Sequence, residues 1–171
     1  MTTTQIMTES KKIIDNFLDL STFTILQNVF LSADIPWYYN KGINKPLNSD
    51  DLNDYQFTHK IYENNRAYSE TFELMQPILK ALEVKALIRI KANLSSKTET
   101  HQVYGLHKDT DFECTTAIMY LNTTNGYTVF ENDEKVDGVE NRLIKFDSQL
   151  KHSGVSSTDT QVRVVLNFNY F

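Results

Sequence analysis

The stretch VRVVLNFN, residues 162–169, has the alternation of a β-strand that is buried on one side. Every second residue from Val162 to Phe168 is apolar, whereas the alternate positions from 163 to 169 hold one arginine, one valine and two asparagines. Successive side chains of a strand point to opposite faces of the sheet. The stretch therefore predicts a strand with one face in the core and a second face that carries Arg163, Asn167 and Asn169.

Other short runs rich in β-branched and aromatic residues lie upstream, at 85–93, 115–121, 127–130 and 142–146. The dipeptide Asn125-Gly126 separates two of these runs and indicates a hairpin that joins them directly. No helical pattern lies between the late runs, which argues against an open parallel α/β sheet. The pattern is typical of a β-sandwich or barrel of short antiparallel strands.

The first third of the chain has a helical pattern, so we expect helices packed outside the β-rich part. Apolar residues at 13, 14, 17 and 18 recur at helical spacing, and a second helix is expected after Ser21, which can cap it. A further helix is expected over 68–82, kinked or split at Pro77. Two extended segments and a polar loop complete this part, at 36–40, 56–62 and 41–55 respectively.

The composition is that of an ordinary globular chain. Its 171 residues are 40% hydrophobic and 23% charged, which suits one domain with its own core. A net charge of -5 makes nucleic acid or an anionic membrane surface an unlikely partner. Cys114 is the only cysteine, which excludes an internal disulfide and a cysteine-based zinc finger. We expect no signal peptide, no membrane span and a cytoplasmic location.

Two histidines and an aspartate have the types and spacing of a metal site. His107 and Asp109 are two residues apart, so on extended backbone an imidazole and a carboxylate point the same way. His152 follows much later, just after the run that ends at residue 146. Two imidazoles and one carboxylate on one side of a metal leave other positions open, which is the ligand set of non-haem Fe(II) oxygenases.

Arg163 and Tyr120 are candidates for binding an anionic molecule beside that metal. Arg163 lies on the polar side of the final strand among apolar neighbours. A buried guanidinium suits a planar anion, such as one end of a dicarboxylate. Tyr120 can share an inward face with Thr116 and Ile118, and its hydroxyl can then reach the same carboxylate.

Several segments together resemble the 2-oxoglutarate- and Fe(II)-dependent dioxygenases, in the prolyl-hydroxylase-like branch and its short members from bacteriophages and marine bacteria. The matching segments, in chain order, are YGLHKD (104–109), TTAIMYLN (115–122), NGYTVF (125–130), RLIKF (142–146), HSG (152–154) and RVVLNF (163–168). The resemblance implies a single oxygenase domain over 1–171, mainly β with helices (α+β). Residues 1–84 would form helical support and first strands, and 85–171 the catalytic double-stranded β-helix, a jelly-roll or cupin-like core.

Residue by residue, the resemblance implies that His107, Asp109 and His152 are the catalytic Fe(II) ligands. It implies that Arg163 holds the distal carboxylate of 2-oxoglutarate and that Tyr120 donates to it. Lys91 and Asn93 would lie on the strand that lines the cosubstrate pocket. The implied reaction uses O2 to hydroxylate a peptidyl proline or a small metabolite, while 2-oxoglutarate is decarboxylated to succinate and ascorbate can serve as reductant.

Two alternatives stay open at this stage. One is a binding module on the same barrel without turnover, and the other is a cupin-like metal-binding barrel that uses Zn²⁺ or Mn²⁺ without the cosubstrate. Retention of Arg163 together with all three ligands favours the hydroxylase, and the carboxylate of Asp109 argues against a halogenase. Only one arginine follows His152, which disfavours nucleic-acid demethylation. The substrate, small molecule or peptide, and the oligomeric state are not specified by the sequence.

Overall fold

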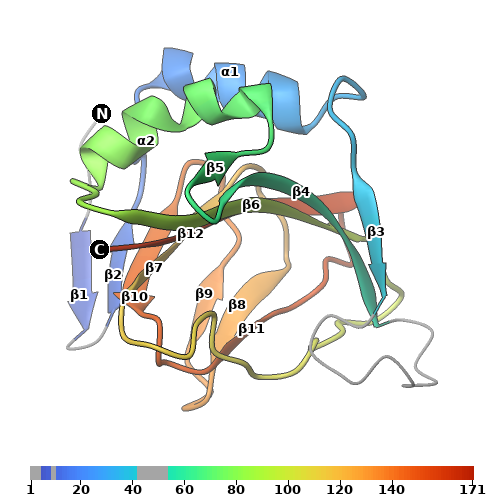
Figure 1. Ribbon diagram of the computed structural model, residues 1–171. Helices are drawn as coiled ribbons and strands as arrows, with labels where there is room; N and C mark the ends of the chain where they lie inside the picture. The colour runs from blue at the N-terminus through green and yellow to red at the C-terminus, as the bar shows by residue number, and fades with distance from the viewer. Residues whose placement is uncertain (1–4, 9–10, 42–53) are drawn as a thin grey trace.

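The computed structural model describes residues 5–8, 11–41 and 54–171, which form two β-sheets and one layer of short helices (Figure 1). The larger sheet has nine strands, in the spatial order β1 (Gln5–Thr8), β2 (Lys11–Ile14), β10 (Leu143–Asp147), β7 (Thr115–Tyr120), β12 (Val162–Tyr170), β6 (Leu87–Ser96), β4 (Tyr55–Glu63) and β3 (Tyr38–Lys41), with β5 (Arg66–Ala67) beside β4. The smaller sheet has the order β11 (His152–Gly154), β8 (Tyr127–Phe130) and β9 (Lys135–Asp137). These strands pair antiparallel, and the two sheets have the layering of a jelly roll.

The helices lie over the face of the larger sheet that points away from the smaller one (Figure 1). Helix α1 (Leu20–Phe30) begins at Asp19, whose carboxylate accepts a hydrogen bond from the Thr22 backbone N–H at 3.0 Å. A 3-10 helix, η1 (Glu70–Met75), leads directly into α2 (Gln76–Ala81). Pro77 lies in the first turn of α2, where a missing N–H costs nothing, so the expected split at Pro77 is confirmed.

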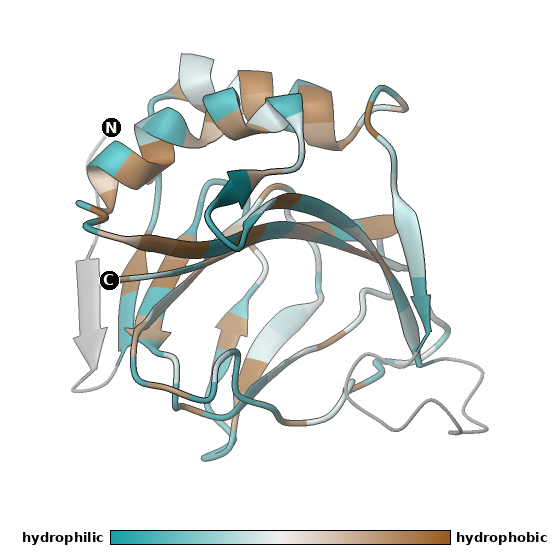
Figure 2. Cartoon of the chain, in the orientation of Figure 1, coloured by the Kyte–Doolittle hydropathy of each residue, from teal (hydrophilic) through white to brown (hydrophobic). Residues whose placement is uncertain are grey.

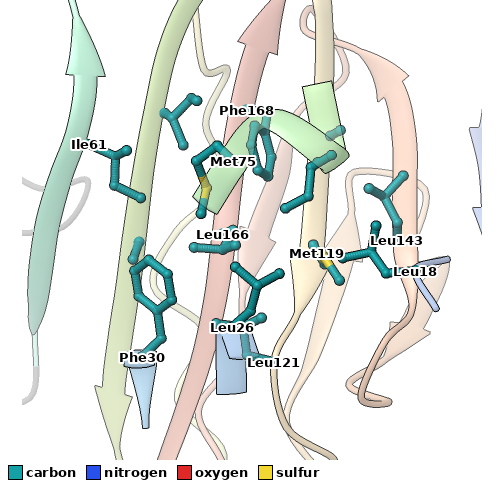
Figure 3. Close-up of a cluster of buried hydrophobic side chains, with 14 of the residues drawn as sticks. Leu18, Leu26, Phe30, Ile61, Met75, Met119, Leu121, Leu143, Leu166 and Phe168 are labelled. Atoms are coloured by element: carbon teal, nitrogen blue, oxygen red, sulfur yellow. The ribbon is translucent and has the colours of Figure 1, made fainter. Parts of the chain in front are cut away.

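The main core fills the space between these helices and the larger sheet. The apolar face of β12 contributes Val164, Leu166 and Phe168, which are fully buried against Leu26 and Phe30 of α1 and their neighbours (Figure 3). Colouring by hydropathy shows brown segments that alternate with polar ones along the helices, and further brown segments on the strands below them (Figure 2). Each such side chain contributes about 1.5–3 kcal/mol by leaving water. The same alternation turns the other face of β12 toward the smaller sheet, as the sequence predicted.

Three expectations from the sequence are wrong. Residues 11–14 form strand β2 rather than a helix, because they pair with β10 in the register Ile14 to Leu143, and Asn16 then adopts a left-handed φ of 51°. The cap of α1 is Asp19 instead of Ser21. Asn125-Gly126 does not close a hairpin, since β7 belongs to the larger sheet and β8 to the smaller one.

The expected strand segments are otherwise confirmed to within a few residues by β3, β4, β6, β7, β8, β10 and β12. Most of the expected loop 41–55 lies outside the described residues. In the part of the chain that the structure describes, no helix has both the length and the apolar character to cross a membrane.

Candidate metal and cosubstrate site

A backbone bridge between two distant segments brings the two candidate histidines face to face. The His107 N–H donates to the His152 carbonyl at 2.9 Å, and the His152 N–H donates back to the His107 carbonyl at 3.0 Å. Residues that exchange both hydrogen bonds in an antiparallel pair present their side chains on the same side. The imidazole centroids accordingly lie 4.8 Å apart.

Asp109 completes a group of three potential metal ligands. Its Oδ1 lies 3.9 Å from Nε2 of His107, and its Oδ2 lies 3.7 Å from Nε2 of His152. One ligand atom from each of the three residues lies within 4.8 Å of the others. The structure therefore brings together the three residues that the sequence proposed as ligands.

The hydrogen bonds of the imidazoles fix which nitrogen is left for a metal. Nδ1 of His107 lies 3.3 Å from the Gly105 carbonyl, and Nδ1 of His152 lies 3.1 Å from the Leu150 carbonyl. A carbonyl only accepts, so each Nδ1 carries the proton and each Nε2 offers a lone pair. This is the usual support of metal-binding histidines, and here both free nitrogens face Asp109.

Three donors from the two central strands hold the Asp109 carboxylate. Asn167 and Asn169 of β12 donate to Oδ2 at 3.0 and 3.4 Å, and Arg89 of β6 donates to Oδ1 at 3.2 Å. Burial would raise the pKa of Asp109, but His152, the Asn167 hydrogen bond and Arg89 together lower it to about 2. The carboxylate is therefore ionised and oriented at neutral pH.

Sequence reasoning did not assign these three donors to the site. The signal for Asn167 and Asn169 was their place on the same face of the last strand as Arg163. The signal for Arg89 was its place on the same face of its strand as Lys91, but the sequence does not show that β6 pairs with β12.

A cavity of about 280 Å³ extends from the three candidate ligands to Arg163. Its walls come from the faces of β6 and β12 that point toward the smaller sheet, and from the smaller sheet itself. They include Asn93, Val165 and Thr128. Arg163 is 7% exposed, and its Nη2 donates two long hydrogen bonds of 3.4 Å, to the Tyr127 carbonyl and to Thr128 Oγ1. Among the described residues, no carboxylate pairs with this guanidinium, and its Nε has no hydrogen-bond partner.

Gly126 makes room for the side chain of Arg163. A Cβ at this position would lie 2.8 Å from Cδ of Arg163 and 2.8 Å from the Val155 carbonyl oxygen. The φ angle of Gly126 is not positive, so a close approach, and not the turn chemistry first inferred, explains this glycine.

Tyr120 lies beside Arg163 but does not line the cavity. The guanidinium is 5.4 Å from the centroid of the Tyr120 ring, and the Tyr120 hydroxyl donates to Thr128 Oγ1 at 2.7 Å. Burial raises the pKa of Tyr120, so the hydroxyl keeps its proton. Thr128 thus stands between Tyr120 and the cavity.

Lys91 and Asn93 both line the cavity. In the register of β6 with β12, Asn93 lies opposite Val165, and Lys91 lies opposite Asn167. Because Asn167 donates to Asp109, Lys91 is level with that carboxylate. Asn93 lies two residues closer along the strand to the level of Arg163. Burial and the neighbouring Arg89 lower the pKa of Lys91 to about 8.

The residues present fit a ferrous ion and a dicarboxylate. Two imidazole nitrogens and one ionised carboxylate converge, as Fe(II) sites with open positions require. An unpaired, buried guanidinium at the other end of the same cavity is costly unless an anion binds there.

Comparisons with known proteins agree with this architecture. No protein-family model and no curated protein matches the chain. Among solved structures, it is similar to a prolyl hydroxylase from Trichoplax adhaerens in complex with a peptide fragment of hypoxia inducible factor, with a TM-score of 0.69, 19% identity, and coverage of 96% of this chain and 84% of that one.

Two further structures show the same likeness. A viral collagen prolyl hydroxylase from Paramecium Bursaria Chlorella virus-1, solved with 2-oxoglutarate, has a TM-score of 0.57 and 16% identity, covering 94% of this chain and 95% of that one. A member of the 2OG-Fe(II) oxygenase family from Burkholderia pseudomallei has a TM-score of 0.66 and 11% identity, covering 94% and 85%.

The layering and the ligand group define a jelly roll with a His-Asp-His site. Within that class, the chain has the prolyl-hydroxylase-like fold of the 2-oxoglutarate- and Fe(II)-dependent oxygenases.

Proposed function

We propose that this protein is an Fe(II)- and 2-oxoglutarate-dependent oxygenase that hydroxylates a C–H bond of a peptide or a small metabolite. The observation that carries the proposal is the placement of His107, Asp109 and His152 at one end of a cavity that has the unpaired Arg163 at its other end. A metal-binding barrel without the cosubstrate has no use for a buried guanidinium at this position.

In this proposal each residue has a defined task. His107 and His152 present Nε2, and Asp109 presents a carboxylate that Asn167 and Arg89 hold in place. A bound ferrous ion supplies the activation of O2, coupled to the decarboxylation of 2-oxoglutarate to succinate.

Arg163 binds the distal carboxylate of 2-oxoglutarate by a charge-assisted pair. Tyr120 donates to the same carboxylate. To do so, its hydroxyl gives up the hydrogen bond to Thr128 and donates to the ligand instead. Asn93, one step from Arg163 along the sheet, contacts the cosubstrate between the metal and the distal carboxylate.

The direct test is the formation of succinate by aerobic protein with Fe(II), ascorbate and 2-oxoglutarate, followed over the slow turnover without substrate. We expect succinate from the natural protein and none from His107→Ala. Under anaerobic conditions, iron and 2-oxoglutarate together should produce a weak charge-transfer band. Absence of that band, with both components at millimolar concentration, contradicts the proposed function.

A further inference from the structure

The cavity contains more positive charge than the proposed cosubstrate requires. Among the described residues that line it, Arg89, Lys91, Lys108 and Arg163 are cationic, and Asp109 is the only carboxylate. A ferrous ion would add two positive charges, and 2-oxoglutarate brings only two negative ones. In a protein of net charge -5, this is a local concentration of unmatched cations.

Building on the proposed function, we infer that Lys91, together with Arg89, binds a carboxylate group of the substrate. The substrate class is therefore a small carboxylic acid whose anionic group lies close to the C–H bond that is oxidised. Lys91 acts as a specificity-determining residue, while Arg89 also positions Asp109.

The register of the central strands separates these two cations from Arg163. Lys91 lies opposite Asn167, and Arg89 lies opposite Asn169, which are four and six residues beyond Arg163. At about 3.3 Å per residue, these levels lie roughly 13 and 20 Å from that of Arg163 along the strand. A cosubstrate that reaches from the metal toward Arg163 therefore points away from Arg89.

Lys91 and Arg89 both have hydrogen-bond donors that lack an acceptor among the described residues. Within the described part of the chain, Lys91 lines the cavity but makes no hydrogen bond and no ion pair. Nε of Arg89 is buried without a hydrogen-bond partner. By contrast, Lys108 donates to Gln149 at 3.0 Å. A buried donor without an acceptor is costly, and a bound carboxylate would supply the acceptor that Nε of Arg89 lacks and a charge partner for Lys91.

The size of the cavity favours a small acid as the source of the carboxylate. A volume of about 280 Å³ is at the low end for ligand sites, and 2-oxoglutarate must share it. An acidic side chain of a peptide has the same chemistry, and the experiment below distinguishes it through a second probe.

The test uses the full chain with Mn(II) in place of iron, which prevents turnover, and with saturating 2-oxoglutarate. Butyrate and butyramide are matched probes that differ in charge, and broadening of their proton resonances by Mn(II) reports binding beside the metal. We expect butyrate to bind at least about tenfold more tightly than butyramide, as a charge-assisted pair implies. In Lys91→Met this preference should fall to within about twofold, and Lys91→Arg should restore it.

Two controls keep this inference separate from the proposed function. Lys97→Met removes the same charge from an exposed site just beyond β6 and should leave the preference unchanged. The affinities for Mn(II) and 2-oxoglutarate, measured before any probe is added, should be the same in Lys91→Met and in the natural protein. Failure of the natural protein to bind either one refutes the proposed function and not the role of Lys91.

Three results would overturn the role of Lys91, and a fourth would overturn the assignment to a small acid. The first is an equal affinity for butyrate and butyramide in the natural protein. The second is butyrate broadening that is seen without 2-oxoglutarate and lost at saturating 2-oxoglutarate, which would place butyrate in the cosubstrate site. The third is a tenfold loss of 2-oxoglutarate affinity in Lys91→Met. Tighter binding of an acetylated aspartyl peptide than of butyrate would overturn the assignment to a small acid.

Discussion

Replacement of Arg163 by methionine should weaken cosubstrate binding without destabilising the protein. The guanidinium is 7% exposed, pairs with no described carboxylate, and makes two hydrogen bonds of 3.4 Å. Burial lowers the pKa of Arg163, which means that its charge is poorly solvated. Because little favourable interaction is lost, we expect the free energy of unfolding to stay within about 1 kcal/mol or to rise.

The affinity for 2-oxoglutarate, in contrast to the stability, should fall clearly in Arg163→Met. A hydrogen bond to a charged partner contributes about 1.5–3 kcal/mol net, so Arg163→Met should weaken binding by about 10- to 150-fold. The measurements are urea unfolding of the metal-free protein, and calorimetric titration of 2-oxoglutarate into the Mn(II)-loaded protein. A binding loss with no stability loss is the signature of a ligand-directed residue.

Arg142→Met is the matched control for this prediction. Arg142 pairs with both carboxylate oxygens of Asp15, at 2.6 and 3.1 Å, away from the cavity. Its loss should cost about 1–2 kcal/mol of stability and leave 2-oxoglutarate affinity unchanged. If Arg163→Met instead loses more than about 3 kcal/mol of stability, or binds 2-oxoglutarate as the natural protein does, then Arg163 does not serve cosubstrate binding as proposed.

Three other outcomes are expected. His107→Ala should abolish binding of Mn(II) in a titration while the protein stays folded, and metal binding at natural affinity would remove this residue from the ligand set. Gly126→Ala should cost about 1–3 kcal/mol in urea unfolding and also weaken 2-oxoglutarate binding, because the added Cβ displaces Arg163; Gly154→Ala, whose Cβ meets Arg163 at an ordinary 3.6 Å, should bind normally. Burial and His152 lower the pKa of His107 below 6.5, so the unfolded chain binds more protons just below that pH. The stability of the metal-free protein should therefore fall as the pH drops below 6.5, and a pH titration of His107→Gln should show a shallower fall.

Local patterns in the sequence predicted those features that depend on the chain's own periodicity. The alternation in residues 162–169 assigned Leu166 to the core and Arg163 to the opposite face, and both are confirmed. Pro77 predicted where the helical segment over 68–82 divides, because the ring removes a backbone donor. These inferences hold since a strand or helix fixes the direction of its side chains without reference to the rest of the chain.

Pairing between distant segments was the source of the errors. Ile13 and Ile14 have helical spacing with Phe17 and Leu18, but backbone pairing with β10 outweighs that short pattern. Asn125-Gly126 looks like a hairpin turn, yet the chain crosses there from one sheet to the other. Propensity over a few residues is worth tenths of a kcal/mol per residue, which a strand ladder and a buried face exceed.

Residue type and spacing were enough to name His107, Asp109 and His152 as candidate ligands. That these side chains meet depends on the folded chain, through the backbone bridge between His107 and His152. The fold also decided that Arg89 and Lys91 face the same cavity, because β6 and β12 are neighbours in the sheet although 65 residues or more separate the chain positions that pair. Side-chain direction is a local property of the backbone, whereas the convergence of charges depends on which strands the folded chain places side by side.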